Sequence, residues 1–305
     1  MSPTLFALRL GPRSLDIHSY GLLVALGAIA GILLAVRQGK RMGFDIPAVL
    51  DLCFWALVAG IVGSRLLYVI VHIGGYSNLC FSPSAPRPAL RALADCAAPL
   101  AVWQGGLVFY GGAIAAAAVV LAFARRRAWR LGDVADLLAP SLALGHVFGR
   151  VGCFLAGCCY GKLCSLGVYF PPASVAYTEL SRQGQISSGA SFTPALAPTQ
   201  LYEAAGEGLL FVWLLFLRGR RRPFSGSLAL VYAMGYALLR GSVEVFRGDT
   251  ARGFLFEWPS PRLATWLGLP MDQALAFSTA QAFSLILGAG AGAAYWLLRR
   301  RSAAL

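Results

Sequence analysis

The chain carries few charged residues. Only 13% of its 305 residues are charged, whereas 58% are hydrophobic, and the mean hydropathy is +0.66. A membrane-spanning helix needs about 20 mainly apolar residues, and the sequence holds several runs of about that length. The scarcity of charge therefore indicates an integral membrane protein.

Three further features are missing. No stretch is long enough or low enough in complexity to separate two domains, and no internal repeat is visible. No small-residue cleavage site accompanies the first apolar run, although Arg9 and Arg13 precede that run. Residues 1–17 are therefore expected to form an external arm on the membrane surface rather than a signal peptide. We expect one integral-membrane domain over residues 1–305.

Seven apolar runs predict seven transmembrane helices. The expected fold class is all-α, a polytopic seven-helix membrane bundle with periplasmic loop and arm elements. The fourth run leads directly into a glycine-rich segment, so its end is the hardest to place. The predicted spans cover residues 18–36, 48–73, 106–124, 134–150, 200–217, 226–246 and 274–298.

Acidic residues are also scarce, with 13 Asp and Glu against 26 Lys and Arg. A strong basic excess can mark a nucleic-acid-binding protein. Fourteen of the 26 basic residues, however, lie in four tracts at every second junction between spans: 37–41, 125–130, 218–222 and 299–301. Basic residues concentrate in cytoplasmic junctions, so the charge indicates topology and not nucleic-acid binding. The N-terminus is then outside, the C-terminus is cytoplasmic, and the main external loops are residues 74–105, 151–199 and 247–273.

Polar residues within the predicted spans gather in the outer halves of those spans. Ionisable groups inside a membrane usually face the bundle interior and mark a functional site. Tyr236, Arg240 and Glu244 are spaced four residues apart, so they share one helix face. The other polar residues at this depth are Tyr20, Arg65, Tyr68, Tyr110, Arg150, Gln200, Tyr202 and Glu203.

These residues also have structural interpretations. Arg240 and Glu244 can form a purely structural ion pair, Arg65 can extend to the headgroups, and Tyr20 and Tyr68 can belong to an interfacial aromatic belt. Arg150 is harder to explain structurally, because it stands in the segment 145–161 with five glycines. Guanidinium groups bind phosphate bidentately. Three arginines near one depth therefore favour a phospholipid headgroup as ligand.

Four motifs resemble those of the bacterial prolipoprotein diacylglyceryl transferases. Their order and spacing are also similar, and the resemblance extends from Tyr20 to the last predicted helix. The resemblance implies an enzyme of the bacterial plasma (inner) membrane with seven spans, the same orientation and an active site that faces the outer leaflet. The motifs are Trp103–Gly112, Gly149–Gly161, Pro198–Glu203 and Arg240–Arg247.

The resemblance also implies an activity. The enzyme would move the diacylglyceryl group of phosphatidylglycerol to the thiol of the lipobox cysteine in a prolipoprotein signal peptide. A thioether forms and glycerol phosphate leaves. The expected partners are phosphatidylglycerol, the prolipoprotein and membrane lipids, and neither a metal nor an organic cofactor is expected. We assume a monomer.

The resemblance assigns roles to particular residues. Arg150 would hold the headgroup, Arg240 would assist at the phosphate, and Glu244 would orient Arg240. Together with Tyr110 these three form the expected catalytic set. The expected substrate-binding residues are Tyr20, Arg65, Tyr68, Gly105, Gly106, Gln200, Tyr202, Glu203 and Tyr236.

Two residues compete for the role of general base. The substrate thiol has a pKa near 8.5 when free and must lose its proton. Some family members have a histidine, assigned as the base, where this chain has Tyr110. Tyrosine titrates near 10, so Tyr110 needs nearby positive charge to act. His146, one helical turn before Arg150, is the alternative, and it can equally be a packing residue. We expect the Tyr110→Phe change to cost more activity than His146→Ala.

Seven cysteines leave a rival interpretation open. Cys153, Cys158, Cys159 and Cys164 form one external cluster, and Cys80 and Cys96 share the first external loop, where a disulfide is permitted. The cluster lacks the Cys-x2-Cys pairs typical of a metal site, but it could serve a membrane thiol/disulfide oxidoreductase. A third class, an anion transporter, would be supported by an inverted repeat. Replacing all seven cysteines should inactivate an oxidoreductase and spare a transferase.

Overall fold

The computed structural model describes residues 4–10, 13–74, 106, 108–187, 189–220, 222–249, 254–258, 262, 265 and 275–303. The chain divides into two compact units. The first consists of Met1–Ala35 and Ala135–Leu305, and the second of Val36–Val134. The boundaries fall near the end of the first long helix and near the start of the fourth.

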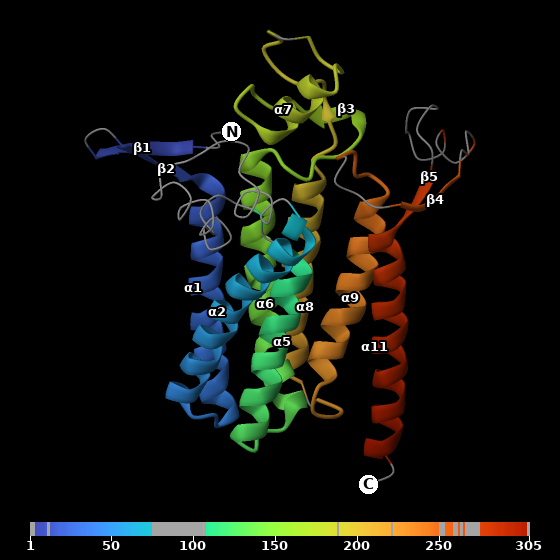
Figure 1. The fold of residues 1–305 in the computed structure, drawn as a ribbon. Coiled ribbons are helices and arrows are strands. Elements are labelled where there is room, and N and C mark those ends of the chain that lie inside the picture. Colours follow the sequence, from blue (N-terminus) through green and yellow to red (C-terminus); the bar gives the residue numbers. More distant parts are fainter. Residues whose placement is uncertain are drawn as a thin grey trace. The chain divides into compact units, whose positions relative to one another are not determined.

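The described part of the chain is mostly helical (Figure 1). Short strands accompany the helices: β1 (Thr4–Leu10), β2 (Arg13–His18), β3 (Leu163–Val168), β4 (Phe254–Trp258) and β5 (Leu275–Ser278). The helices are α1 (Ser19–Met42), α2 (Ile46–Val71), α5 (Phe109–Arg126), α6 (Leu131–Ala156), α7 (Val175–Arg182), α8 (Thr199–Arg218), α9 (Ser227–Glu244) and α11 (Thr279–Ala303).

Six helices in the described ranges are long and apolar enough to cross a membrane: α1, α2, α5, α6, α8 and α11. Each overlaps one predicted span. The remaining predicted span, residues 226–246, overlaps α9, which is 18 residues long and contains Arg240 and Glu244. Helix α9 is not among the six, because these charged residues dilute its apolar character. The chain is therefore a multi-pass membrane protein.

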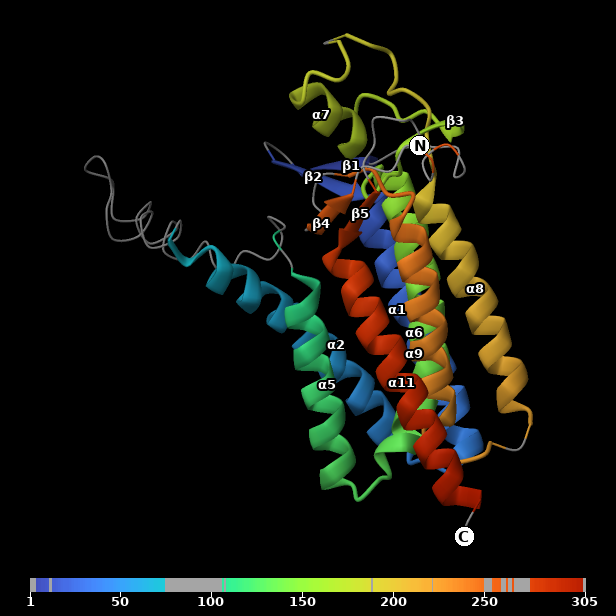
Figure 2. The ribbon, with the colours of Figure 1, turned by 90° about the vertical axis from the view of Figure 1, so that its right-hand side faces the viewer.

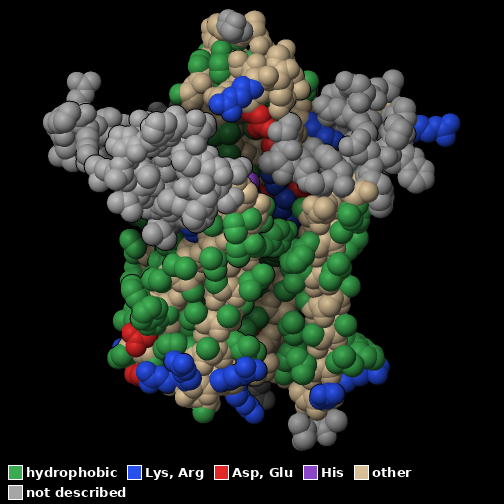
Figure 3. Space-filling model, in the orientation of Figure 1, with side chains coloured by type: hydrophobic (Ala, Val, Ile, Leu, Met, Phe, Trp, Pro, Cys, Tyr) green, Lys and Arg blue, Asp and Glu red, His purple; other side chains and the backbone are tan. Residues whose placement is uncertain are grey.

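Basic residues stand at the C-terminal ends of several of these helices. The last turns hold Lys40 and Arg41 in α1, Arg125 and Arg126 in α5, Arg218 in α8, and Arg300 and Arg301 in α11. Figure 3 shows hydrophobic side chains along the helices and Lys and Arg side chains at helix ends. Cations at a helix C-terminus also interact favourably with the helix dipole.

In the second unit, α2 packs closely against α5. The two helices approach so closely at Gly63 and Gly111 that a Cβ atom on either residue would lie within 2.5 Å of the carbonyl oxygen of the other. Only glycine permits such an approach between two backbones. This packing sets the position of Arg65 and Tyr68, which follow Gly63 on α2.

In the first unit, α9 packs against both α8 and α11, and Figures 1 and 2 show it beside each of them. The start of α9 is held by α6. Its N-cap residue Gly226 has no side chain, and Asp136 of α6 accepts hydrogen bonds from the backbone N–H groups of Gly226 and Ala229, both at 3.0 Å. Asp136 also pairs with Arg222 at 3.1 Å and is fully buried.

We expect Asp136→Ala to destabilise the protein by about 3 kcal/mol, since it removes the cap of α9 and two charge-assisted hydrogen bonds in a buried setting. Thermal unfolding in detergent would measure the loss. Asp45→Ala is the matched control, because Asp45 is exposed and lies 3.9 Å from the exposed Arg127. Such surface pairs contribute about 0–1 kcal/mol. Equal losses in the two variants would refute the capping role.

Two antiparallel hairpins lead into helices. Strands β1 and β2 pair, and α1 begins directly after β2; likewise β4 and β5 pair, and α11 begins directly after β5. An arm was predicted over residues 1–17 and a loop over residues 247–273, and no strands were predicted in either. Ser278 and Gln281 exchange side-chain and backbone hydrogen bonds of 3.0 and 3.1 Å at the start of α11. This reciprocal cap fixes where the strand ends and the helix begins.

Candidate active site

Helix α6 continues through the glycine-rich segment. The predicted span ends at residue 150, but the helix extends to Ala156, and the first left-handed residue after it is Gly157 with φ of +76°. The glycines are tolerated because other groups pack on them: a Cβ on Gly152 would lie 3.1 Å from the Tyr20 ring of α1. Arg150 therefore lies within the helix and not at its end.

Arg150 is held by a buried carboxylate. Its guanidinium lies 2.8 Å from the Glu203 side chain in the first turns of α8, and the side chains are 22% and 3% exposed. Burying an ion pair is costly unless both partners are well placed. An arginine held in this way among apolar helices is preorganised to receive an anion on its remaining N–H groups.

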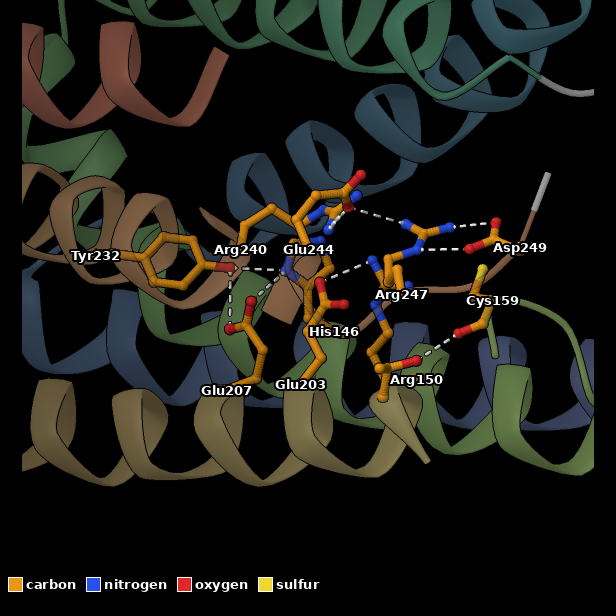
Figure 4. Close-up of polar contacts among 11 residues, drawn as sticks. His146, Arg150, Cys159, Glu203, Glu207, Tyr232, Arg240, Glu244, Arg247 and Asp249 are labelled. Atoms are coloured by element: carbon orange, nitrogen blue, oxygen red, sulfur yellow. Dashed lines mark hydrogen bonds and ion pairs between the residues drawn. The ribbon is translucent and has the colours of Figure 1, made fainter. Parts of the chain in front are cut away.

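A second carboxylate serves two arginines. Glu244 accepts a hydrogen bond of 2.5 Å from Arg240 and lies 3.8 Å from Arg247. Arg247 in turn donates two hydrogen bonds, of 2.6 and 2.8 Å, to Asp249 (Figure 4). Burial disfavours the charge of Arg247, but Asp249 outweighs this effect and raises the pKa of that guanidinium. Arg247 and Asp249 were not predicted as site residues, although Arg247 closes one of the four motifs.

His146 belongs to a hydrogen-bonded cluster with Glu207 and Tyr232. Its Nδ1 lies 3.0 Å from Glu207 and 2.8 Å from the Tyr232 hydroxyl, which also donates to Glu207 at 3.3 Å. The His146 ring lies 5.4 Å from the Tyr236 ring. Glu207 and Tyr232 were not predicted. The signal was present, since they extend the patterns of Glu203 and Tyr236 by four residues, one helical turn.

Three helices thus meet along polar faces. On α6 and α8, His146 pairs with Glu207 and Arg150 pairs with Glu203, each pair one turn from the other. Helix α9 contributes Tyr232, which bonds to His146 (Figure 4). The arrangement gathers paired charges and hydrogen-bonding groups between apolar helices, where electrostatic interactions are stronger than in water.

Three cysteine sulfurs meet directly beyond α6. The Sγ atoms of Cys153, Cys158 and Cys159 lie within 4.8 Å of one another. Hydrogen bonds with Cys153 and Cys158 lower the pKa of the Cys159 thiol; burial opposes this shift, and the nearby Arg247 and Arg150 support it. Cys159 also has a left-handed backbone with φ of +58°, a conformation that costs a non-glycine residue about 1–2 kcal/mol. Cys164 is not part of this group of three sulfurs.

The loop that carries two of these cysteines is fixed by α8. Gln200 donates a hydrogen bond of 2.7 Å to the Cys158 carbonyl, and Thr199 donates one of 2.7 Å to the Cys159 carbonyl. Gln200 is almost fully buried. Its side-chain amide therefore positions the loop. Within the described ranges, Cys53, Cys153, Cys158, Cys159 and Cys164 form no disulfide; Cys80 and Cys96 lie outside those ranges.

Two tyrosines that were predicted to bind substrate are half-exposed. Tyr20 and Tyr202 are 45% and 44% exposed. The Tyr202 ring lies 6.4 Å from the Phe246 ring beyond α9. Both tyrosines therefore border the polar residues of the first unit without filling their centre.

The second unit holds the remaining predicted site residues. Arg65 is buried, donates a hydrogen bond of 3.2 Å to the Gly106 carbonyl, and lies 5.3 Å from the centre of the Tyr68 ring. Gly106 has φ of +70°, and a Cβ there would lie 2.5 Å from the Tyr68 ring, so only glycine fits. Tyr110 begins α5 and is 48% exposed. Gly105 lies outside the described residues.

A family model described as prolipoprotein diacylglyceryl transferase matches residues 5–297. The chain belongs to this family. Three relatives named phosphatidylglycerol–prolipoprotein diacylglyceryl transferase are similar over most of their length. The Clostridium tetani protein is 33% identical over 252 residues, which are 82% of this chain and 86% of the relative. The proteins of Methylococcus capsulatus and Stenotrophomonas maltophilia are each 32% identical and cover 83% of this chain and 86% and 83% of their own lengths.

The diacylglyceryl transferase resemblance inferred from the four motifs is therefore confirmed. The matched range contains all four motifs, from Trp103 to Arg247, and every predicted site residue from Tyr20 onward. The oxidoreductase and transporter alternatives are not favoured, because the family match accounts for nearly the whole chain.

Proposed function

We propose that this protein transfers the diacylglyceryl group of phosphatidylglycerol to the cysteine thiol of a prolipoprotein lipobox. The family match supports the reaction. At the level of residues, the proposal rests on Arg150 and Arg240. Each of these arginines is paired with a buried carboxylate between apolar helices. Two fixed guanidinium groups suit a phosphodiester that must gain negative charge as its bond breaks.

The reaction requires one proton transfer and one substitution. The lipobox thiol gives its proton to a base, and its sulfur attacks the glyceryl carbon that bears the phosphate. A carbon–sulfur bond forms while the carbon–oxygen bond to phosphate breaks. The electron pair leaves with the oxygen, so the departing glycerol phosphate carries one more negative charge than the phosphodiester of the lipid did. Arg150 holds the headgroup and Arg240 stabilises the developing charge, while Glu244 orients Arg240.

Other residues are proposed to shape the substrate site. Tyr20, Tyr202, Glu203 and Tyr236 border the arginines in the first unit, and Gln200 fixes the loop beside them. Their mixture of aromatic surface and polar tips suits the region where a lipid headgroup meets its acyl chains. The proposed set also includes Arg65, Tyr68, Gly105 and Gly106 from the second unit.

The proposed topology follows from the charge pattern. The seven long helices of the described ranges span the membrane as one transferase domain, with the N-terminus outside and the C-terminus in the cytoplasm of a bacterium. The basic C-terminal ends of α1, α5, α8 and α11 support this orientation. The site then faces the outer leaflet of the plasma membrane, where phosphatidylglycerol and an exported prolipoprotein meet. Cysteine labelling with a membrane-impermeant reagent would test the orientation.

A direct assay tests the function. The purified protein is incubated with phosphatidylglycerol and a lipobox peptide, and the peptide is weighed by mass spectrometry. We expect one diacylglyceryl group on the cysteine sulfur. Two matched controls are used. One replaces that cysteine of the peptide with serine, and the other replaces phosphatidylglycerol with phosphatidylethanolamine. If folded protein supplied with phosphatidylglycerol leaves the peptide unmodified, the proposal is refuted.

The base is assigned to Tyr110, with His146 as the second candidate because Glu207 and Tyr232 hold its ring. We expect Tyr110→Phe to reduce the rate more than His146→Ala, since loss of a general base costs roughly 10²–10⁴-fold. The measurement is the pH–rate profile of each variant with a lipobox peptide. If Tyr110→Phe keeps the profile of the unaltered enzyme while His146→Ala loses its lower-pH limb, the base is His146.

A further inference from the structure

Glu207 on α8 is a buried carboxylate that needs a positive partner. Its side chain is 1% exposed, and an ionised carboxylate buried without such a partner is costly. Within the described ranges, Glu207 forms hydrogen bonds with His146 Nδ1 at 3.0 Å and with the Tyr232 hydroxyl at 3.3 Å. Of these two neighbours, only His146 can carry a positive charge. The imidazole of His146 therefore supplies the charge that offsets Glu207.

The same hydrogen bonds fix which nitrogen of His146 carries hydrogen. An ionised carboxylate only accepts hydrogen bonds, so Nδ1 donates to Glu207. The Tyr232 hydroxyl donates its hydrogen to Glu207, and its oxygen accepts from Nδ1 at 2.8 Å. A buried carboxylate on Nδ1–H holds an imidazole in one tautomer and stabilises the imidazolium form. The other ring nitrogen, Nε2, makes no hydrogen bond to any residue that the structure describes, so it stays available to a ligand.

His146 and Arg150 present their donors along one face of α6. The two residues are four apart, which is one helical turn, and a turn rises about 5.4 Å. Their partners Glu207 and Glu203 are likewise one turn apart on α8, and Figure 4 shows both pairs in one close-up. The His146 side chain is 36% exposed, more than the 22% of Arg150. A group bound by Arg150 is therefore within reach of the His146 ring.

We propose that His146, protonated on both ring nitrogens, donates from Nε2 to the phosphate of phosphatidylglycerol, and that Glu207 is the positioning residue that keeps it charged. This inference rests on the proposed transfer reaction. The phosphate gains negative charge as its bond to the glyceryl carbon breaks, so a charged donor beside Arg150 stabilises the transition state more than the bound lipid. The hydrogen stays on Nε2 throughout, and Tyr110 keeps the role of base.

A donor and a base at position 146 predict opposite pH dependences. A donor must be protonated, so the rate falls on the alkaline side as the imidazolium loses its proton. A base must be unprotonated, so the rate falls on the acidic side. Glu207 favours the charged imidazole, whereas Arg150 opposes it and is itself balanced by Glu203. The charged and titratable groups around the ring are Glu203 and Glu207 of α8, Tyr232 and Tyr236 of α9, and Arg150 of α6.

The pH–rate profile of the Glu207→Gln variant tests the positioning role. Glutamine keeps an oxygen that accepts from Nδ1 but removes the charge, so the alkaline limb of kcat/KM should move to lower pH by about 1–3 units, while the acidic limb stays. His146→Phe, which keeps an aromatic ring, should lose the alkaline limb and reduce transfer by roughly 10–100-fold. Asp51→Asn is the matched control and should leave the profile unchanged, because Asp51 is an exposed carboxylate on α2.

Two outcomes of these profiles would overturn the proposal. One is an alkaline limb that Glu207→Gln leaves where the unaltered enzyme has it, which would make Glu207 a packing residue. The other is loss of the acidic limb in His146→Phe, which would make His146 a base.

Nitrogen-15 NMR tests the donor in an unaltered active site. The chain has three histidines, so labelling their ring nitrogens gives few signals, and His18→Gln and His72→Gln assign that of His146 by elimination. At the pH of the transfer assay we expect a charged His146 ring. Phosphatidylglycerol without peptide should shift its Nε2 signal, whereas diacylglycerol, which lacks phosphate, should not. A neutral ring or an unshifted signal, with transfer intact, would overturn this inference and leave the proposed function standing. A shifted signal without any transfer to a lipobox peptide would instead refute the proposed function.

Discussion

Arg150→Ala is expected to lower diacylglyceryl transfer by a hundredfold or more. The guanidinium is proposed to contact the headgroup phosphate, and removing one such charge-assisted contact from a preorganised site costs on the order of 3–4 kcal/mol in the transition state. Arg150→Lys should recover only part of the rate, because an ammonium cannot bind phosphate in the bidentate manner. The rate with phosphatidylglycerol and a lipobox peptide, measured by mass spectrometry, checks both.

The structure supplies a control for folding in this experiment. Removing Arg150 leaves Glu203 buried and without the partner that lies 2.8 Å away. A double variant with Arg150→Ala and Glu203→Gln removes that buried charge, and should recover stability without recovering transfer. Arg182→Ala is the matched surface control, since Arg182 is exposed at the end of α7. Near-normal turnover in the single alanine variant would remove Arg150 from the site.

Glu244→Ala is expected to destabilise the protein more than Arg240→Ala. Glu244 serves two arginines, at 2.5 Å from Arg240 and 3.8 Å from Arg247, so its loss removes the carboxylate that pairs with Arg240 and leaves Arg247 with Asp249 alone. Loss of Arg240 still leaves Glu244 beside Arg247. Breaking a buried ion pair costs roughly 3–5 kcal/mol. We expect about that loss for Glu244→Ala and a smaller one for Arg240→Ala.

The double variant, with alanine at positions 240 and 244, should be more stable than Glu244→Ala alone. A double-mutant cycle of unfolding midpoints in detergent gives the coupling energy, for which interacting neighbours typically show about 0.5–3 kcal/mol. Arg240→Ala and the double variant should both lose transfer, because both lack the guanidinium that is proposed to stabilise the phosphate. The stability cycle is therefore measured separately from the rate. Strict additivity in the cycle would show that the two side chains do not stabilise each other.

The positions of the helices could be predicted from the sequence, because they depend on local composition. Every predicted span overlaps a helix, since an apolar run of membrane length has no other way to satisfy its backbone in lipid. The ends of the helices were harder to predict. Helix α6 runs six residues past Arg150 to Ala156 because packing by neighbours such as Tyr20 offsets the low helix propensity of glycine. The strands beside α1 and α11 were also missed.

Part of the candidate site could also be predicted, because it too depends on local spacing in the sequence. Charged and aromatic residues spaced by four reveal one face of one helix, and this pattern selected Tyr236, Arg240 and Glu244. The same pattern, extended by one turn, would have included Tyr232 and Glu207. Arg247 and Asp249 follow α9 outside any regular repeat, so no periodic signal marked them.

By itself, the sequence determined the membrane class, the helical character and the residue types available for an anion site, because each follows from composition and local spacing. Only the tertiary structure decided the partners. Glu207 contacts His146 across 61 positions of sequence, and Tyr232 contacts it across 86. Such pairings depend on how α6, α8 and α9 rotate and pack, which no local pattern specifies. The same packing, with α8 holding the loop after α6, brings the three sulfurs of Cys153, Cys158 and Cys159 together.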